Sequence, residues 1–412
     1  MTSDNATSWT TYVVADLIAD GSLIIGDGYR AKNSEMAAEG LPFARAGNIR
    51  GGINVDGADL LSTSSVERAG GKVSQPGDVI FTSKGTVGRF AFVRDDDPQV
   101  VYSPQVCFWR SAAPDLIDSE FLYYWMHGPD CLRQFNALKG QTDMADYISL
   151  RDQATITVRL PPLVEQRRIA GVLGALDSKV RAEARLSDRL LETAAHMFAG
   201  VVEEARASGA TAVPASHLID INPKVVIKKG QPTPFLEMAA TDPWAVRPRS
   251  IGSRPFSGGS KFEPGDTLLA KITGCIEHGK GGFVDYLPGP AAGSTEFLVL
   301  RAGDRLTPES VFLISRWPSV REHLIRHMVG SSGRQRVPPD AFETLELTVP
   351  ETLSVWSGEA AFIEAAFARS KAAWDLARHH SAIRDELVPK LVTGGLRVSE
   401  DYDPDAASAF VG

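Results

Sequence analysis

Short apolar runs follow the same turn motif at two distant places in the chain. Residues 75–78 read Gln-Pro-Gly-Asp and precede the apolar run 79–81, and residues 263–266 read Glu-Pro-Gly-Asp and precede the largely apolar run 267–269. Proline and glycine favour a turn, and a short apolar run bounded by a turn is typical of a buried strand. The pattern therefore predicts a turn that leads into a short strand at both places.

The same order of features continues after both strands, at a spacing of about 190 residues. The matched segments are the loops 84–88 and 271–274, the helix starts 119–123 and 309–313, the turns 140–142 and 330–332, and the strand ends 158–162 and 347–351. This spacing suits the duplication of a whole domain. Because all matches keep one order, we predict two globular copies of one fold.

A long helix is predicted after each copy, over residues 165–205 and 358–392, because no cluster of glycines interrupts either segment. Apolar residues recur along each helix at spacings close to those of a coiled coil, although Glu183 and Ser187 interrupt the first stripe. Antiparallel pairing of the two helices buries both stripes at once. The alternative is that each helix packs only on its own domain.

These elements together predict the fold class and the domain organisation. The prediction is an α/β protein with globular domains at residues 8–160 and 210–350, joined by two long antiparallel coiled-coil helices within 161–209 and 351–398, and followed by an acidic tail at 399–412. A length of 412 residues agrees with more than one core.

Composition narrows the class of protein. The chain has 43% hydrophobic and 23% charged residues, which is typical of a globular protein. Its 37 Gly and 25 Pro indicate many turns. The first residues carry no Lys or Arg, and no apolar run reaches the roughly 18 residues of a membrane span, so we expect a cytoplasmic protein with no membrane partner. Cys107, Cys131 and Cys275 are scattered, without the spacing of metal ligands.

The distribution of charge changes the picture that a net charge of −8 gives. Residues 1–160 hold 14 basic and 20 acidic side chains, whereas residues 210–350 hold 16 basic and 14 acidic ones. The net negative charge of the whole chain argues against nucleic acid as a partner. The second copy is mildly basic, however, and can still present a basic face to nucleic acid.

Two stretches resemble the central and C-terminal conserved helical regions of the specificity subunit of Type I restriction-modification enzymes. Residues 160–170 read Leu-Pro-Pro-Leu-Val-Glu-Gln-Arg-Arg-Ile-Ala and are followed by Leu176-Asp177, and residues 383–398 read Ile-Arg-Asp-Glu-Leu-Val-Pro-Lys-Leu-Val-Thr-Gly-Gly-Leu-Arg-Val. The order of copy, helix, copy and helix over about residues 30–398 is also similar to this family.

The resemblance implies that each copy is a target-recognition domain that reads half of a split target in double-stranded DNA. It also implies that the helices set the gap and that two methyltransferase subunits dock alongside, with a restriction and translocase subunit as an optional further partner. Residues 349–354 of the second copy depart from the fuller motif at residues 161–166, so equivalent docking by both copies does not follow.

Sequence motifs for catalysis are missing. The chain has neither a glycine-rich turn for a methyl donor nor the Asn/Asp-Pro-Pro-aromatic loop of adenine methyltransferases, and residues 222–224 are interpreted as a turn. Asp266 and Lys271 lack the second acid of a nuclease metal site, and no HExxH motif occurs. We therefore predict a non-catalytic subunit with no catalytic residue, no metal and no cofactor.

Polar and basic residues on glycine-rich loops are the candidates for contacts with phosphates and base edges. In the first copy these are Arg45, Asn48, Lys84, Thr86, Arg89, Lys139, Gln141 and Thr142. In the second copy they are Lys261, Lys271, Thr273, Arg334, Gln335 and Arg336, with Arg247 and Arg249 on a neighbouring loop. Lys84 and Lys271 are interpreted as equivalent residues at one junction of strand and loop.

Three functions remain open from these residues alone. The first is a DNA sequence-recognition subunit that binds a bipartite target and positions methyltransferase and restriction subunits. The second is a scaffold that does not bind DNA and recruits partner proteins through its helices. The third is an enzyme that acts alone, which methylation by the purified chain without other subunits would reveal.

Overall fold

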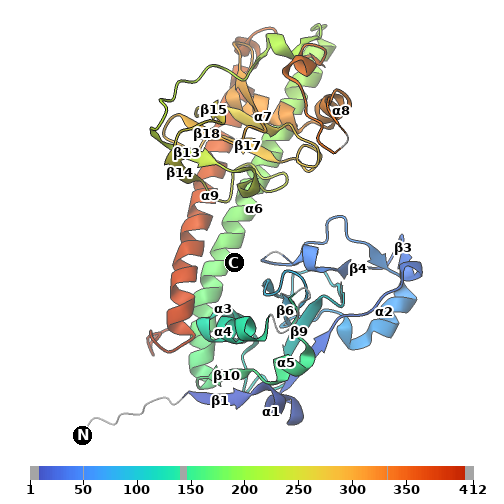
Figure 1. Cartoon of the computed structure of the whole chain (residues 1–412), viewed down its shortest axis with the longest axis vertical. Helices are drawn as coiled ribbons and strands as arrows, with labels where there is room; N and C mark the ends of the chain where they lie inside the picture. The colour runs from blue at the N-terminus through green and yellow to red at the C-terminus, as the bar shows by residue number, and fades with distance from the viewer. Residues whose placement is uncertain (1–8, 50, 140–145, 332, 404–412) are drawn as a thin grey trace. The chain divides into compact units, whose positions relative to one another are not determined.

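The computed structural model describes residues 9–49, 51–139, 146–331 and 333–403. The chain forms two compact units, the first from residues 1–181 with 377–412 and the second from residues 182–376. Each unit contains one globular copy together with part of each long helix (Figure 1). Among the described residues, no helix is both long and apolar enough to cross a membrane.

The first unit contains two four-stranded sheets and a short two-stranded one. The first sheet has the order β2 (Leu23–Asp27), β9 (Val106–Ser111), β6 (Val79–Thr82) and β7 (Phe90–Phe92). The second has the order β3 (Met36–Ala37), β5 (Leu60–Leu61), β4 (Leu41–Ala44) and β8 (Val101–Tyr102), and β1 (Thr10–Val13) pairs with β10 (Thr157–Leu160). The helices are α1 (Val14–Ala19), α2 (Thr63–Ala69), α3 (Ser119–His127), α4 (Pro129–Leu138) and α5 (Leu150–Ala154).

The second unit repeats this arrangement. Its first sheet has the order β12 (Ile219–Ile221), β19 (Phe297–Ala302), β16 (Thr267–Ala270) and β17 (Gly281–Phe283). Its second has the order β14 (Gly252–Pro255), β13 (Pro232–Leu236), β18 (Ala291–Gly293) and β15 (Ser260–Phe262), and β11 (Val213–Pro214) pairs with β20 (Glu346–Leu347). The helices α7 (Pro308–Arg316) and α8 (Pro318–Arg326) correspond to α3 and α4.

Strand register confirms the internal repeat. β6 is antiparallel to both neighbours, with Val79 opposite Phe92 and Trp109, and β16 is likewise antiparallel, with Thr267 opposite Phe283 and Leu300. Each second sheet contains one parallel pair, β4 with β8 and β13 with β18. The two copies therefore share a topology as well as a turn motif.

The long helices are α6 (Leu163–Ala207) and α9 (Ser357–Leu391), close to the predicted 165–205 and 358–392. In the first unit, the carboxylate of Asp177 on α6 lies 2.5 Å from Arg384 on α9. In the second, the hydroxyl of Ser187 on α6 lies 2.8 Å from that of Ser370 on α9, in a buried contact. Ser187, one of the two polar residues that interrupt the apolar stripe of α6, thus contacts a polar residue of α9.

Apolar side chains surround these polar contacts. In the second unit Phe198 of α6 lies within one core cluster with Ile363 and Phe367 of α9, and in the first unit Leu173 of α6 lies within one with Leu391 of α9. The prediction that the two helices pair is confirmed, and each helix also packs on the globular domain of its unit.

Candidate nucleic-acid interface

The repeated Pro-Gly-Asp motif forms the predicted turn in both copies. Gly77 and Gly265 have φ values of +87° and +93°, which a residue with a side chain rarely adopts. Asp78 is completely buried and accepts hydrogen bonds from Nε and Nη2 of Arg110 at 2.6 and 2.8 Å. The motif therefore holds the turn against the neighbouring strand.

The second copy repeats this buried ion pair. Asp266 is also completely buried and accepts hydrogen bonds from Nε and Nη2 of Arg301 at 2.7 and 2.8 Å. The carboxylate raises the pKa of Arg301, as Asp78 raises that of Arg110. Asp266 therefore holds the turn against β19, as Asp78 holds it against β9 in the first copy. Among the described residues no cluster of three potential metal ligands occurs.

Four of the predicted residues of the second copy lie together where β16 ends. The backbone of Thr273 and its hydroxyl both donate to the carbonyl of Gln335, at 3.0 and 3.1 Å. The backbone of Val337 donates to the carbonyl of Lys271 at 2.8 Å, and Ile272 forms a β-bridge with Arg336. The loop after β16 and the exit of the loop around Arg334 thus form one surface.

Arg336 is held in place on this surface by a carboxylate. Its Nε and Nη2 bind both oxygens of Glu296 at 2.8 and 2.7 Å, and its side chain is 44% exposed. The hydrogen bonds from Arg336 lower the pKa of Glu296, so this carboxylate stays ionised and holds the guanidinium. Glu296 was not among the predicted residues, because its role depends on β19 lying beside β16.

The first copy builds the same junction with other side chains. The backbone of Ile148 donates to the carbonyl of Ser83 at 3.0 Å, and Lys84 forms a β-bridge with Tyr147. Comparison with the second copy places Ser83 where Lys271 lies, and Lys84 where Ile272 lies. The predicted equivalence of Lys84 and Lys271 is therefore wrong by one residue.

The same comparison places Tyr147 where the second copy has Arg336. Tyr147 is 46% exposed and was not predicted. Its alternation with the buried Ile148 in a short strand-like segment is the signal that could have found it. Gln141 and Thr142, in the segment just before it, lie outside the described residues.

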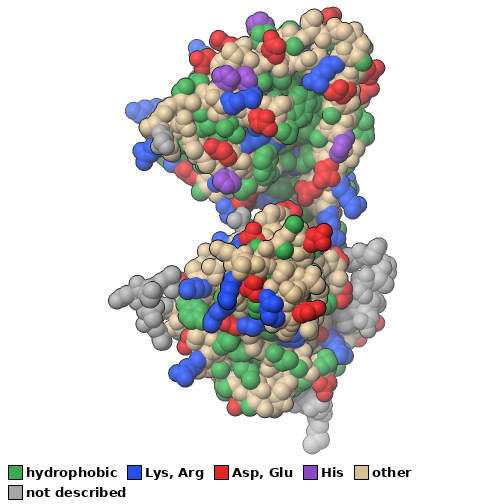
Figure 2. Space-filling model, turned by 90° about the vertical axis from the view of Figure 1, so that its right-hand side faces the viewer, with side chains coloured by type: hydrophobic (Ala, Val, Ile, Leu, Met, Phe, Trp, Pro, Cys, Tyr) green, Lys and Arg blue, Asp and Glu red, His purple; other side chains and the backbone are tan. Residues whose placement is uncertain are grey.

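Two of the remaining candidates of the first copy, Arg89 and Lys139, donate to backbone carbonyls of loops that carry other candidates. Arg89 donates to Ala46 O at 3.5 Å, beside the 3-10 turn η2 (Ala46–Asn48) that carries Asn48 and follows Arg45. Lys139 donates to Val87 O at 3.3 Å, in the loop that also carries the exposed Thr86. Figure 2 shows several Lys and Arg side chains gathered on the face of this unit that is turned towards the viewer.

The loop of Arg247 and Arg249 requires one correction. Arg247 is 4% exposed, pairs with Asp285, and donates to Ser370 Oγ of α9 at 3.1 Å. It therefore anchors the domain to the helix and cannot reach DNA as a surface residue. Arg249 is exposed and pairs with Asp242 at 2.9 Å, whereas Lys261 lies elsewhere, 5.9 Å from the ring centroid of Phe256.

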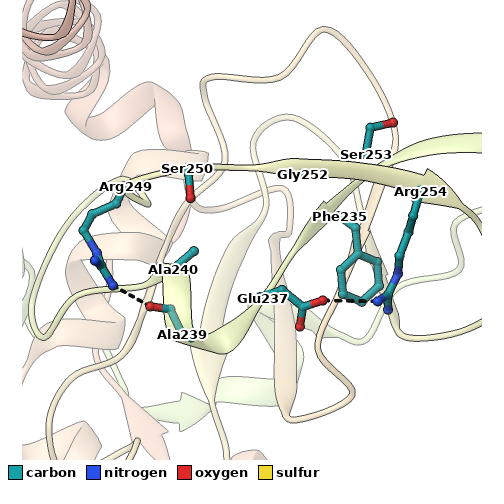
Figure 3. A pocket seen from close by; sticks show the side chains of 9 residues that line it. All are labelled: Phe235, Glu237, Ala239, Ala240, Arg249, Ser250, Gly252, Ser253 and Arg254. Atoms are coloured by element: carbon teal, nitrogen blue, oxygen red, sulfur yellow. Dashed lines mark hydrogen bonds and ion pairs between the residues drawn. The ribbon is translucent and has the colours of Figure 1, made fainter. Parts of the chain in front are cut away.

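An unpredicted arginine lies beside this loop, on the exposed strand β14. Figure 3 shows Arg254 stacked on the ring of Phe235 and paired with Glu237, whose carboxylate lies 3.2 Å from Arg254 Nη1. All four residues of β14 are exposed. Sequence reasoning missed Arg254 because the candidates were sought on loops, although Gly252-Ser253 directly before it is a loop-like signal.

The departure of residues 349–354 from the motif at 161–166 has a structural explanation. Gln166 is buried and donates to the carbonyls of Leu116 and Pro161, both at 2.9 Å, which joins α6 to the first domain. In the second copy Arg305 donates to the carbonyls of Val349 and Pro350 at 2.9 and 3.1 Å. The two sequences therefore differ in how each domain is joined to its helix.

Comparison with known proteins finds a matching family model and similar solved structures. Residues 23–192 match the model of the Type I restriction modification DNA specificity domain. The fold is similar to the crystal structure of a Type I restriction-modification S subunit from M. genitalium, with a TM-score of 0.54, 12% identity, and coverage of 95% of this chain and 98% of that one. No curated protein matches the sequence.

Two further solved structures are similar at lower scores. The HsdS subunit from Thermoanaerobacter tengcongensis has a TM-score of 0.36 and 17% identity, with 96% of this chain and 100% of that chain covered. A chain from a structure on complex assembly and conformational transition of the type I R-M system has a TM-score of 0.38 and 17% identity, with 94% and 98% covered.

Proposed function

We propose that this chain, which belongs to the DNA specificity subunits of Type I restriction-modification systems, reads a bipartite target with one globular copy for each half. The duplication carries this proposal. Both copies keep the strand order and the buried Asp–Arg pair, but they differ at the junction where Tyr147 corresponds to Arg336. Two domains with one scaffold and different exposed side chains are suited to read two different sequences.

The division of labour follows the chain. Residues 8–160 and 210–350 are the two target-recognition domains, residues 161–209 and 351–398 supply the helices that set the gap, and residues 399–412 form a tail outside both functions. The continuous helices α6 and α9 support this division, because a rigid element fixes a distance better than a loop does.

The partners are double-stranded DNA and two methyltransferase subunits, with a restriction and translocase subunit in complexes that also cleave DNA. The chain supplies sequence recognition and positions these subunits, and it acts without a cofactor of its own. Membership of the specificity-subunit family supports DNA and other subunits as partners. The duplication of copy and following helix supports two methyltransferase subunits, which need not dock in the same way because residues 349–354 depart from the motif at residues 161–166.

Exchange of one domain tests the proposal. Residues 210–350 are replaced by the second recognition domain of another specificity subunit, and methylated positions are mapped across the genome of a host that expresses the complex. One half of the target should change, while the other half and the gap stay the same. A change in both halves would show that reading is not divided between the copies.

A further inference from the structure

Phe43 and Phe235 hold the same place in the two copies. Phe43 lies where β4 pairs in parallel with β8, and Phe235 lies where β13 pairs in parallel with β18. A 3-10 turn follows each strand closely, η2 in the first copy and η5 (Met238–Ala240) in the second. Side chains around these two rings can therefore be compared position by position.

An arginine and a carboxylate lie beside each phenylalanine ring, but they come from different positions in the two copies. In the first copy Arg45 follows the phenylalanine by two residues, with its guanidinium carbon 5.5 Å from the ring centroid and its Nη1 2.5 Å from Asp59. In the second copy Glu237 takes the position of Arg45, and Arg254 comes from the neighbouring strand β14, 3.3 Å from the ring centroid (Figure 3). Each copy thus builds one arrangement of guanidinium, carboxylate and ring from different positions.

Both guanidiniums are available to a ligand. The side chains of Arg45 and Arg254 are each 48% exposed, and among the described residues only Nη1 of each bonds a carboxylate. A guanidinium has five N–H donors, so most donors of each remain free. The ring fixes the plane of the guanidinium and the carboxylate fixes its direction, which reduces the entropy lost on binding.

The surface beside Arg254 has room for a polar group. A cavity of about 440 Å³ lies there, lined by Glu237, Arg249, Ser250, Ser253 and Arg254 among others. Figure 3 shows Arg249 and Arg254 at opposite ends of this group of residues. Arg254 and the hydroxyls of Ser250 and Ser253 can donate to an anionic ligand here, whereas Arg249 is paired with Asp242 and donates to Ala239 O.

We propose that Arg45 and Arg254 each bind a phosphate of the DNA backbone, one in each half of the target; this inference rests on the proposed function. Two domains that read different half-targets share the phosphate backbone but not the bases. An arrangement that both copies keep, although its residues come from different positions, suits the shared ligand. Arg336, whose place is taken by Tyr147 in the first copy, suits base reading instead.

The test measures DNA affinity of the full chain assembled with its methyltransferase subunits, for duplexes with the target and with an unrelated sequence, at several salt concentrations. Arg254→Ala should weaken both duplexes by about tenfold at about 0.1 M salt and should reduce the salt slope by about 0.9. Arg206→Ala is the matched control, because Arg206 is 54% exposed and pairs with Glu203, and it should change neither quantity.

A charge exchange separates ligand binding from support of the fold. Arg254→Glu alone should weaken DNA binding further than Arg254→Ala does. The double variant, Glu237→Arg with Arg254→Glu, places an arginine at the position that Arg45 has in the first copy. The double variant should recover both affinity and salt slope. No recovery, in a variant that unfolds at the wild-type temperature, would overturn the proposal.

Two other outcomes also decide the matter. A loss confined to one single-base variant of the target, with an unchanged salt slope, would make Arg254 a base reader and overturn the phosphate assignment. If the wild-type complex itself binds DNA without any preference for a bipartite target, the proposed function fails. The two failures are therefore distinguishable.

Discussion

Asp78 and Asp266 are completely buried, and each carboxylate accepts two hydrogen bonds from an arginine of the neighbouring strand. Asp78 also accepts a hydrogen bond from the hydroxyl of Tyr102 at 2.6 Å. Removing one partner of a buried ion pair leaves the other charge without compensation, so the loss exceeds the net value of the pair.

Asp78→Ala is expected to lower the free energy of unfolding by about 3–5 kcal/mol, because the Arg110 guanidinium then remains partly buried without its acid. Urea unfolding measures this value. Asp130→Ala is the control, since Asp130 pairs with Arg133 at an exposed helix surface, and its cost should stay below about 1 kcal/mol. Equal effects of the two variants would contradict a structural role of the Pro-Gly-Asp motif.

Arg336 and Lys271 share one surface but are expected to respond differently. Arg336→Gln should reduce discrimination at one base pair of the second half-target by about five- to a hundredfold, because a bidentate guanidinium distinguishes guanine from other bases. Lys271→Ala should instead weaken all sequences equally and reduce the salt slope by about one unit, as for one lost phosphate contact.

The measurement is the affinity of the assembled complex for a panel of single-base target variants at two salt concentrations. Gln335→Ala belongs in the same panel, because its backbone is fixed by Thr273 while its side chain is partly exposed. If Arg336→Gln weakens every variant by the same factor, this arginine contacts the backbone and base reading lies elsewhere in the domain.

Secondary-structure elements were more predictable than residues. The long helices and the strands after the Pro-Gly-Asp turns follow from periodicity and turn chemistry, which are local properties. The register between the copies was missed by one residue at Lys84, because it depends on pairing with residues about 60 positions away in the chain. Glu296 was missed for the same reason, since its contact with Arg336 joins residues 40 positions apart in the chain. Arg254 was missed because it lies on a strand, whereas the candidates were sought on loops.

The helix α3 carries an acid whose ionisation opposes folding. Burial raises the pKa of Glu120 to about 7, despite the opposing charge of Arg94. A Cβ at Gly174 of α6 would lie 2.7 Å from this carboxylate, which shows how closely the two elements pack. Because the folded state binds the proton more tightly than the unfolded state, stability falls as the pH rises between the two pKa values.

Glu120→Gln is therefore expected to stabilise the protein above about pH 7, by up to about 3 kcal/mol, and to have little effect near about pH 4. Thermal or urea unfolding as a function of pH measures this difference. A stabilisation by Glu120→Gln that does not vary with pH would refute the assignment to Glu120.

At the scale of the whole molecule, the chain divides between residues 181 and 182 and again between residues 376 and 377, and both divisions fall inside the long helices. Each unit therefore contains a globular copy and one stretch of each helix. If the helices set the gap between the half-targets, lengthening both at these divisions should move the half-targets apart without changing either of them.

Insertion of seven residues into each helix, after Val180 and after Leu376, tests this expectation. Seven residues keep the apolar stripes in phase and lengthen a helix by about 10 Å, which corresponds to about three base pairs of DNA. Genome-wide mapping of methylated sites should show both original half-targets with a gap about three base pairs wider. Three base pairs also rotate the duplex by about 100°, so methylation of the widened target should be slower than that of the original by the wild type.

The control for this experiment is an insertion of seven residues after Gly209, between α6 and the second globular copy, where the chain has left the helix. Because a flexible segment does not transmit length, this variant should keep the original gap or accept a range of gaps. A helix variant that methylates only sites with the original gap would show that spacing is set within the globular copies, and the paired helices would then serve only to hold the two units together.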